Sequence, residues 1–136
     1  MVVTWHAFDG IIDSKAYDFD LCRKLLNEFL SLRAFFYGDY YPLTPYSVDA
    51  QTWMAWQFDR PDLEEGILQA FRRPECANES EKYKLFGIDP ELGYTVTNLD
   101  IPGSMRMSGR ELMTDGILVT LTDSPAAAVI KYRSTR

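Results

Sequence analysis

The stretch FYGDYYPLTPYS, from Phe36 to Ser47, separates two different patterns of apolar residues in this chain. Before it, apolar residues recur every three or four positions, which is typical of an amphipathic helix. After it, they alternate with polar residues, which is typical of strands with one buried face. We therefore predict a helical region and a β-region joined by an aromatic connector that forms a seam between domains. The predicted seam residues are Tyr37, Asp39, Tyr40, Tyr41 and Tyr46.

The region before the connector predicts one helix from Asp18 to about Phe36. Its apolar stripe consists of Phe19, Cys22, Leu25, Leu26, Phe29, Leu32 and Phe36. Asp18 is a good N-cap residue, and Gly38 is expected to end the helix in a left-handed conformation. We assign residues 18–38 to this helical part. Residues 1–17 are either the remnant of a strand, Val2–Trp5, with its loop, or a flexible N-terminus.

The region after the connector predicts strands that are short and separated by turn signals. We expect strands at residues 53–58, 67–72, 82–88, 94–99, 104–108, 117–122 and 127–133, with one helical turn over 109–116. The predicted fold is mainly β, an antiparallel β-sandwich of about seven to eight strands with Greek-key-like connections, preceded by one amphipathic α-helix. The sandwich domain is expected to span residues 39–136.

The composition excludes several classes of function. The chain has 136 residues and a net charge of −6, and its basic residues form no stripe, which argues against nucleic acid and anionic membranes as partners. No apolar run approaches the ~20 residues of a membrane span. No signal peptide is visible, and two cysteines that we expect to be reduced slightly favour the cytoplasm.

The sequence contains no pattern for catalysis by this chain. His6 is the only histidine, and there is no Cys-x-x-Cys, phosphate loop or dinucleotide fingerprint. Asp59, Asp62, Glu64 and Glu65 are expected at the solvated tip of a hairpin. We therefore predict no catalytic residue, no metal site and no cofactor.

Aromatic residues leave two interpretations open. Trp53, Tyr40 and Tyr41 are candidates for contact with carbohydrate, since aromatic faces suit the apolar faces of sugars. Alternatively, the aromatic residues fill the seam and the core. Trp53 and Trp56 are expected on opposite faces of one strand, so they cannot form one flat platform.

The order of motifs resembles the C-terminal end of α-galactosidase-type glycoside hydrolases, around family 36 and its clan relatives. The motifs that carry the resemblance are Phe36–Thr44, Trp53–Phe58, Gln69–Arg73, Tyr83–Pro90, Tyr94–Asp100 and Ser108–Met113. Each motif alone is a weak match to the family, but six motifs in this order and spacing are a more specific match. Together they cover nearly the whole chain from Asp18 onward.

The resemblance implies a (β/α)8 catalytic barrel followed by an antiparallel sandwich. The helix at 18–36 would be the last barrel helix, and Val2–Trp5 the last barrel strand. The two catalytic aspartates of this retaining family lie on earlier strands, and none matches here. The implied function is a non-catalytic domain that braces the barrel of the parent chain. Two alternatives stay open: a stand-alone carbohydrate-binding module, and a module that self-associates through Leu25, Leu26, Phe29 and Leu32.

Overall fold

The computed structural model describes residues 18–136 of the chain. The predicted strand Val2–Trp5, its loop to residue 17 and His6 lie outside the described residues. The described part belongs to two compact units, one ending at Ala34 and the other running from Phe35 to Arg136. We describe each unit by itself.

The first unit contains α1, Phe19–Leu32, which confirms the predicted helix as far as Leu32. The residues that follow, Arg33–Tyr37, form a 3-10 helix, η1, where the prediction continued the α-helix to about Phe36. Its N-cap is Asp18, whose carboxylate accepts a hydrogen bond from the backbone N–H of Leu21 at 2.8 Å. The apolar stripe is only partly covered: Leu32 is buried, whereas Leu25 and Leu26 are 37% and 40% exposed. A helix with this much exposed leucine presents apolar surface that a further partner can bury.

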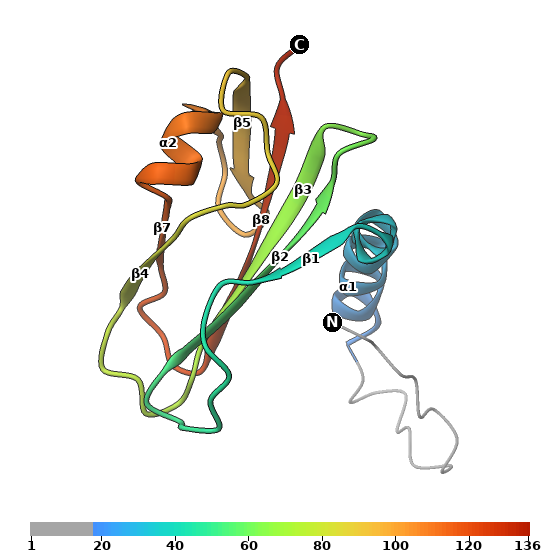
Figure 1. Cartoon of the computed structure of the whole chain (residues 1–136). Helices are drawn as coiled ribbons and strands as arrows, with labels where there is room; N and C mark the ends of the chain where they lie inside the picture. Colours follow the sequence, from blue (N-terminus) through green and yellow to red (C-terminus); the bar gives the residue numbers. More distant parts are fainter. Residues whose placement is uncertain (1–17) are drawn as a thin grey trace. The chain divides into compact units, whose positions relative to one another are not determined.

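The second unit contains two antiparallel sheets, as predicted. The large sheet has the strand order β1 (Asp39–Pro42), β2 (Trp53–Arg60), β3 (Glu65–Arg72), β8 (Ala126–Ser134), β5 (Gly93–Asn98) and β6 (Met105–Ser108). The small sheet pairs β4 (Ser80–Tyr83) with β7 (Ile117–Thr120). Figure 1 shows the small sheet and the helix α2 (Gly109–Thr114) together on one side of the large sheet.

The core lies between the two sheets because each strand alternates its side chains between faces. Trp53 and Ala55 of β2 point inward, and the register sets Ala55 opposite Ala70 of β3. The same core includes Ile117 and Val119 of β7 and Leu112 of α2. The C-terminal strand β8 lies between β3 and β5, so the last residues of the chain complete the sheet (Figure 1).

Three other local predictions differ from the structure. Part of the aromatic connector is a strand, β1, which pairs with β2 along its whole length. The strand predicted over 82–88 covers only Ser80–Tyr83, and no strand or helix is formed from residue 84 to residue 92. Gly38 is not a left-handed stop: a Cβ at this position would lie 2.0 Å from the Asp59 carbonyl oxygen, so glycine is required by a close approach of two backbones.

Candidate docking face and cavities

The large sheet has an outer face, opposite the core, that is rich in apolar and aromatic side chains. On β2 this face carries Met54, Trp56 and Phe58, because their neighbours in the strand point into the core. The register sets Phe71, Gln69 and Ile67 of β3 opposite them. From β8 it sets Ala127, Val129 and Lys131 beside the β3 residues. We call this set of residues the outer face.

One end of the outer face is covered by the segment with which this unit begins. Phe35 is 2% exposed, and the Lys131 ammonium lies 5.0 Å from the centre of its ring. Phe36 packs edge-on against Phe58, with ring centres 5.2 Å apart. The chain therefore enters the sandwich domain across its outer face.

The other end of the outer face remains partly exposed. Trp56 and Phe71 pack with ring centres 5.0 Å apart, and the Trp56 indole N–H donates to Gln69 Oε1 at 2.8 Å. Met54, Trp56, Phe71 and Val129 are all partly exposed, and Ala127 is exposed. An apolar surface of this kind on one side of a sheet is typical of a contact with another domain or protein.

The predicted seam residues do not share one surface. Tyr37 and Tyr46 are 88% and 93% exposed, and Asp39 is also exposed. Tyr40 lies on the outer side of β1, 5.4 Å from the Phe58 ring. Tyr41 points to the opposite side, is half-buried and stacks on Phe86 at 5.9 Å.

Trp53, the third candidate for sugar contact, lies in the core. It is 6% exposed, and its indole N–H donates to the Asn78 carbonyl at 3.0 Å. Trp53 and Trp56 do lie on opposite faces of β2, as predicted from their spacing. The ring of Trp53 therefore presents no broad open face on the surface of the domain.

The predicted solvated hairpin tip is wrong for Asp59. Asp62 is exposed and pairs with Arg60 at 2.6 Å, but Asp59 is 3% exposed and lies within β2. Asp59 Oδ1 accepts a 2.5 Å hydrogen bond from the Tyr132 hydroxyl, which itself accepts from Gln57 Nε2 at 2.7 Å. Burial raises the pKa of the Asp59 carboxyl and that of the Tyr132 hydroxyl. Side chains alternate between the two faces of β2, and Asp59 lies on the same inward face as Trp53 and Ala55, which explains its burial.

Asp59 borders a small polar cavity of about 200 Å³. The cavity is also lined by Glu64, Asp89 and Arg136. The Arg136 guanidinium pairs with Glu64 at 3.0 Å and lies 3.7 Å from Asp89. Arg136 is therefore shared by two carboxylates at the wall of this cavity.

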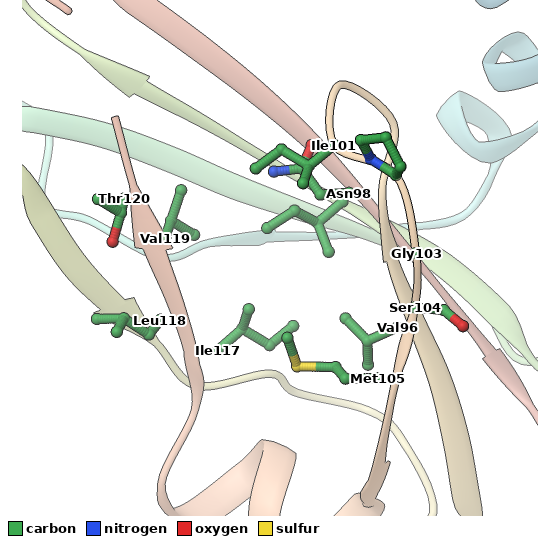
Figure 2. A pocket seen from close by; sticks show the side chains of 12 residues that line it. Val96, Asn98, Ile101, Gly103, Ser104, Met105, Ile117, Leu118, Val119 and Thr120 are labelled. Atoms are coloured by element: carbon green, nitrogen blue, oxygen red, sulfur yellow. The ribbon is translucent and has the colours of Figure 1, made fainter. Parts of the chain in front are cut away.

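A larger cavity of about 370 Å³ opens between the two sheets, at the edges of β6 and β7. Its lining is mainly apolar, and Figure 2 shows Ile117 of β7 and Met105 of β6 pointing toward one another across it. Asn98, Ser104 and Thr120 are its polar members, and none of its lining residues is charged. A third cavity, of about 340 Å³, lies between the segment after β1 and strand β4.

The described residues contain no cluster of metal-ligating side chains and no membrane-spanning helix. Within residues 18–136, no group of three or more His, Cys, Asp and Glu side chains is placed to hold a metal ion. No helix in this part of the chain is long and apolar enough to cross a membrane. Cys22 and Cys76 are both free thiols.

Comparison with known families identifies the sandwich. Residues 53–132, more than half of the chain, match the glycosyl hydrolase family 36 C-terminal domain. The chain belongs to this family. The family 36 match begins at β2 and ends in β8, so it spans nearly the complete pair of sheets. No curated protein sequence matches the chain.

Solved α-galactosidases share the fold of this family 36 domain. The α-galactosidase AgaA of Geobacillus stearothermophilus superposes with a TM-score of 0.72 and 19% identity, over 90% of this chain and 17% of that enzyme. The α-galactosidase of Lactobacillus brevis gives 0.69 and 18%, over 90% of this chain and 18% of its own. The galactosidase domain of an α-galactosidase–sucrose kinase gives 0.62 and 19%, over 82% and 15%. The chain therefore spans less than a fifth of the length of the enzymes that it resembles.

Proposed function

We propose that this family 36 domain is non-catalytic and braces the (β/α)8 barrel of an α-galactosidase-like hydrolase through the outer face of its large sheet. The observation that carries the proposal is the partly exposed cluster of Met54, Trp56, Phe71 and Val129. Burying apolar surface contributes roughly 25 cal/mol per Å², so a cluster of this kind favours association with a second apolar surface. The cluster adjoins the end where Phe35 and Phe36 bring the chain onto the sheet.

Helix α1 supports the same proposal from the other unit. Phe19, Leu21 and Leu30 are 53%, 48% and 45% exposed. An amphipathic helix with this exposure requires further packing, and the last helix of a barrel packs against neighbouring barrel elements. A barrel closes only with all eight units, so α1 alone supplies one part of it. In this proposal the exposed tyrosines of the connector, Tyr37 and Tyr46, line the seam with the barrel.

Catalysis then belongs to the barrel. The structural neighbours are α-galactosidases, and we propose that the parent protein hydrolyses terminal α-galactosides with retention, using two carboxylates supplied outside this chain. Within residues 18–136, the buried Asp59 is engaged by Tyr132, and Glu64 and Asp89 share Arg136. These carboxylates therefore hold structure rather than face a glycosidic bond.

The test uses the coding region that precedes this domain in its gene, expressed as a separate polypeptide together with the 136-residue chain. We expect the two to co-purify and the complex to hydrolyse p-nitrophenyl α-galactoside. Trp56→Lys and Phe71→Lys should each abolish co-purification, because they place a charge in the apolar contact. Leu118→Lys is the matched control, since Leu118 is 57% exposed on β7, away from the outer face.

Two results would contradict the proposal. One is co-purification that survives both Trp56→Lys and Phe71→Lys. The other is a homodimer of the chain that these two variants turn into monomers, which would assign the outer face to self-association. Substituting Leu25 and Leu26 by lysine then separates a dimer formed by α1 from one formed by the sheet.

A further inference from the structure

The side of the large sheet that bears the outer face continues onto β5 and β6, where arginines replace apolar residues. The register sets Thr95 of β5 opposite Arg133 of β8. On the other edge of β5, Thr95 lies opposite Arg106 of β6. Directly opposite residues of antiparallel strands project from the same side of a sheet, so these three residues form one row. We call Arg106 and Arg133 the arginine pair.

The arginine pair projects away from the core. The residues on either side of Thr95 in β5, Tyr94 and Val96, are buried in the core, and so is Tyr132, which precedes Arg133 in β8. Because side chains alternate between the two faces along a strand, Thr95 and Arg133 belong to the outer side. Arg106 belongs to the same side through its pairing with Thr95.

The charges of the arginine pair are not neutralised within the described part of the chain. Arg106 is exposed and forms no ion pair with another residue of this part. The Arg133 side chain is 72% exposed, and its Nε lies 4.0 Å from Glu65 Oε2. Lys131 Nζ lies much closer to the same Glu65 oxygen, at 2.8 Å. One carboxylate is therefore shared by two cations, and the row keeps a positive charge.

Positive charge is concentrated on this side of the sheet although the chain as a whole has a net charge of −6. The outward positions of the large sheet carry one carboxylate, Glu65, and four cations: Arg60, Arg106, Lys131 and Arg133. Like charges on neighbouring strands repel one another, so this arrangement does not stabilise the isolated domain. It favours instead a contact with a surface of opposite charge.

The arginine pair and the apolar cluster lie on either side of the segment that brings the chain onto the sheet. Along β8, Val129 belongs to the apolar cluster, Lys131 lies against the Phe35 ring, and Arg133 comes next on the same side. Alternate residues of a strand are about 7 Å apart, so Val129 and Arg133 are separated by about 13 Å. A protein interface of ordinary size, roughly 800 Å² on each partner, covers both.

We propose that the arginine pair binds carboxylate side chains on the surface of the barrel that docks on the outer face. This inference rests on the proposed docking and adds the chemistry of the partner: an apolar patch flanked by aspartate or glutamate residues. An apolar centre with charged residues at its margin is the usual composition of a protein interface.

The residue types and their spacing fit carboxylate ligands. The planar fork of donors in arginine binds a carboxylate at two points. Neighbouring strands are about 4.8 Å apart, so Arg106 and Arg133 start about 10 Å apart, with Thr95 between them. The Thr95 hydroxyl adds a donor to the same row. A long polyanion such as nucleic acid is disfavoured, because the rest of the chain is acidic and would repel it.

The test measures the binding of the 136-residue chain to the polypeptide encoded by the preceding coding region, by surface plasmon resonance. Between roughly 0.1 and 1 M NaCl the screening length falls from about 10 Å to about 3 Å, so the association rate should fall about tenfold. Arg106→Glu and Arg133→Glu should each lower the rate at low salt about tenfold and reduce its salt dependence. Lys82→Glu is the matched control with the same change of net charge. It replaces an exposed cation of the small sheet and should bind as the wild type does.

A second measurement detects the partner carboxylates directly. A carbodiimide couples carboxylates to lysine amines but not to guanidinium groups. Arg106→Lys should therefore gain a cross-link to an aspartate or glutamate of the barrel, which peptide mass spectrometry detects. Lys82 of the same chain is the internal control and should form no cross-link to the barrel.

The outcomes separate this inference from the docking proposal. If Trp56→Lys abolishes binding while both arginine variants bind as the wild type does, and residue 106 forms no cross-link, the inference is wrong and docking stands. An equal effect of Lys82→Glu would also overturn it, because net charge alone would then explain the result. Self-association of the chain that the arginine variants disrupt would assign the pair to a second copy instead. If the wild type does not bind the barrel polypeptide at all, both proposals are wrong.

Discussion

At the scale of single residues, Asp59 shows how the sheet places a charge where the sequence predicts solvent. Its neighbours Asp62, Glu64 and Glu65 indicate an exposed tip. Asp59, however, is one of the alternate residues of β2 whose side chains point into the core. Its one hydrogen-bond donor in the described part of the chain is Tyr132 of β8, 73 residues away in the sequence. No local pattern contains such a partner.

Asp59 should make stability depend on pH. Burial raises its pKa above the ordinary value of 3.8, the Tyr132 hydrogen bond opposes this rise, and Asp39 adds to it. The folded state therefore holds the Asp59 proton to higher pH than the unfolded state does. The contribution of this raised pKa to the free energy of unfolding is fully present below the ordinary pKa of 3.8. It is lost as the pH rises through the raised pKa of the folded state.

We expect the unfolding free energy of the wild type, relative to Asp59→Asn, to fall across that window of pH. Urea denaturation at a series of pH values measures this difference. Glu64, Asp89 and Arg136 face the same cavity, but they are present in both proteins, so their titration largely cancels. Asp115→Asn, an exposed substitution, serves as the control. A difference that stays constant with pH, or that rises, would contradict the prediction.

At the scale of elements, Arg72 fastens the end of β3 to the segment that leads into β8. It is 7% exposed, and its guanidinium donates to the carbonyls of Cys76 (2.9 and 3.1 Å), Leu121 (2.7 Å) and Thr122 (2.7 Å). All of these acceptors are backbone carbonyls, which suit the fixed fork of donors in arginine. Arg72 therefore supplies hydrogen-bond donors to backbone carbonyls of loop residues that have no neighbouring strand to pair with.

Arg72→Met should destabilise the domain by about 3 kcal/mol, because it leaves several buried carbonyls without donors. Arg72→Lys should recover only part of this loss, since one ammonium cannot reach all of them. Arg110→Met is the control: Arg110 is exposed and pairs with Glu91 on the surface, so we expect a change within about 0.5 kcal/mol. Urea denaturation measures all three. A cost for Arg72→Met no larger than that of the control would contradict this role.

Helix α2 shows an element whose start is readable from sequence. Ser108 and Glu111 form a capping box: Ser108 Oγ accepts from the Glu111 N–H at 3.2 Å, and the Glu111 carboxylate accepts from the Ser108 N–H at 2.7 Å. The pattern Ser-x-x-Glu lies within four consecutive residues, so the sequence alone contains this signal. The flanking glycines predict a helical turn over 109–116, and the capping box adds the position of its first residue.

At the scale of the whole molecule, the sandwich should fold without α1. Every member of the main core cluster falls between Trp53 and Tyr132. We expect residues 35–136 alone to unfold cooperatively, with a midpoint within about 4 °C of the 136-residue chain. Thermal unfolding followed by circular dichroism measures this. Loss of a cooperative transition would show that α1 belongs to the same folding unit.

The sequence by itself determined the elements of this protein. Apolar spacing predicts α1, alternation predicts most of the strands, and the order of motifs indicates the family, because these signals repeat over short distances in the chain. The tertiary structure decided which strands pair and which side chains are buried together. It made β1 out of the aromatic connector, buried Trp53 and Asp59, and gathered apolar side chains of β2, β3 and β8 on one outer face. These outcomes depend on pairing between strands far apart in the sequence, and spacing within one strand cannot specify which strand becomes its neighbour.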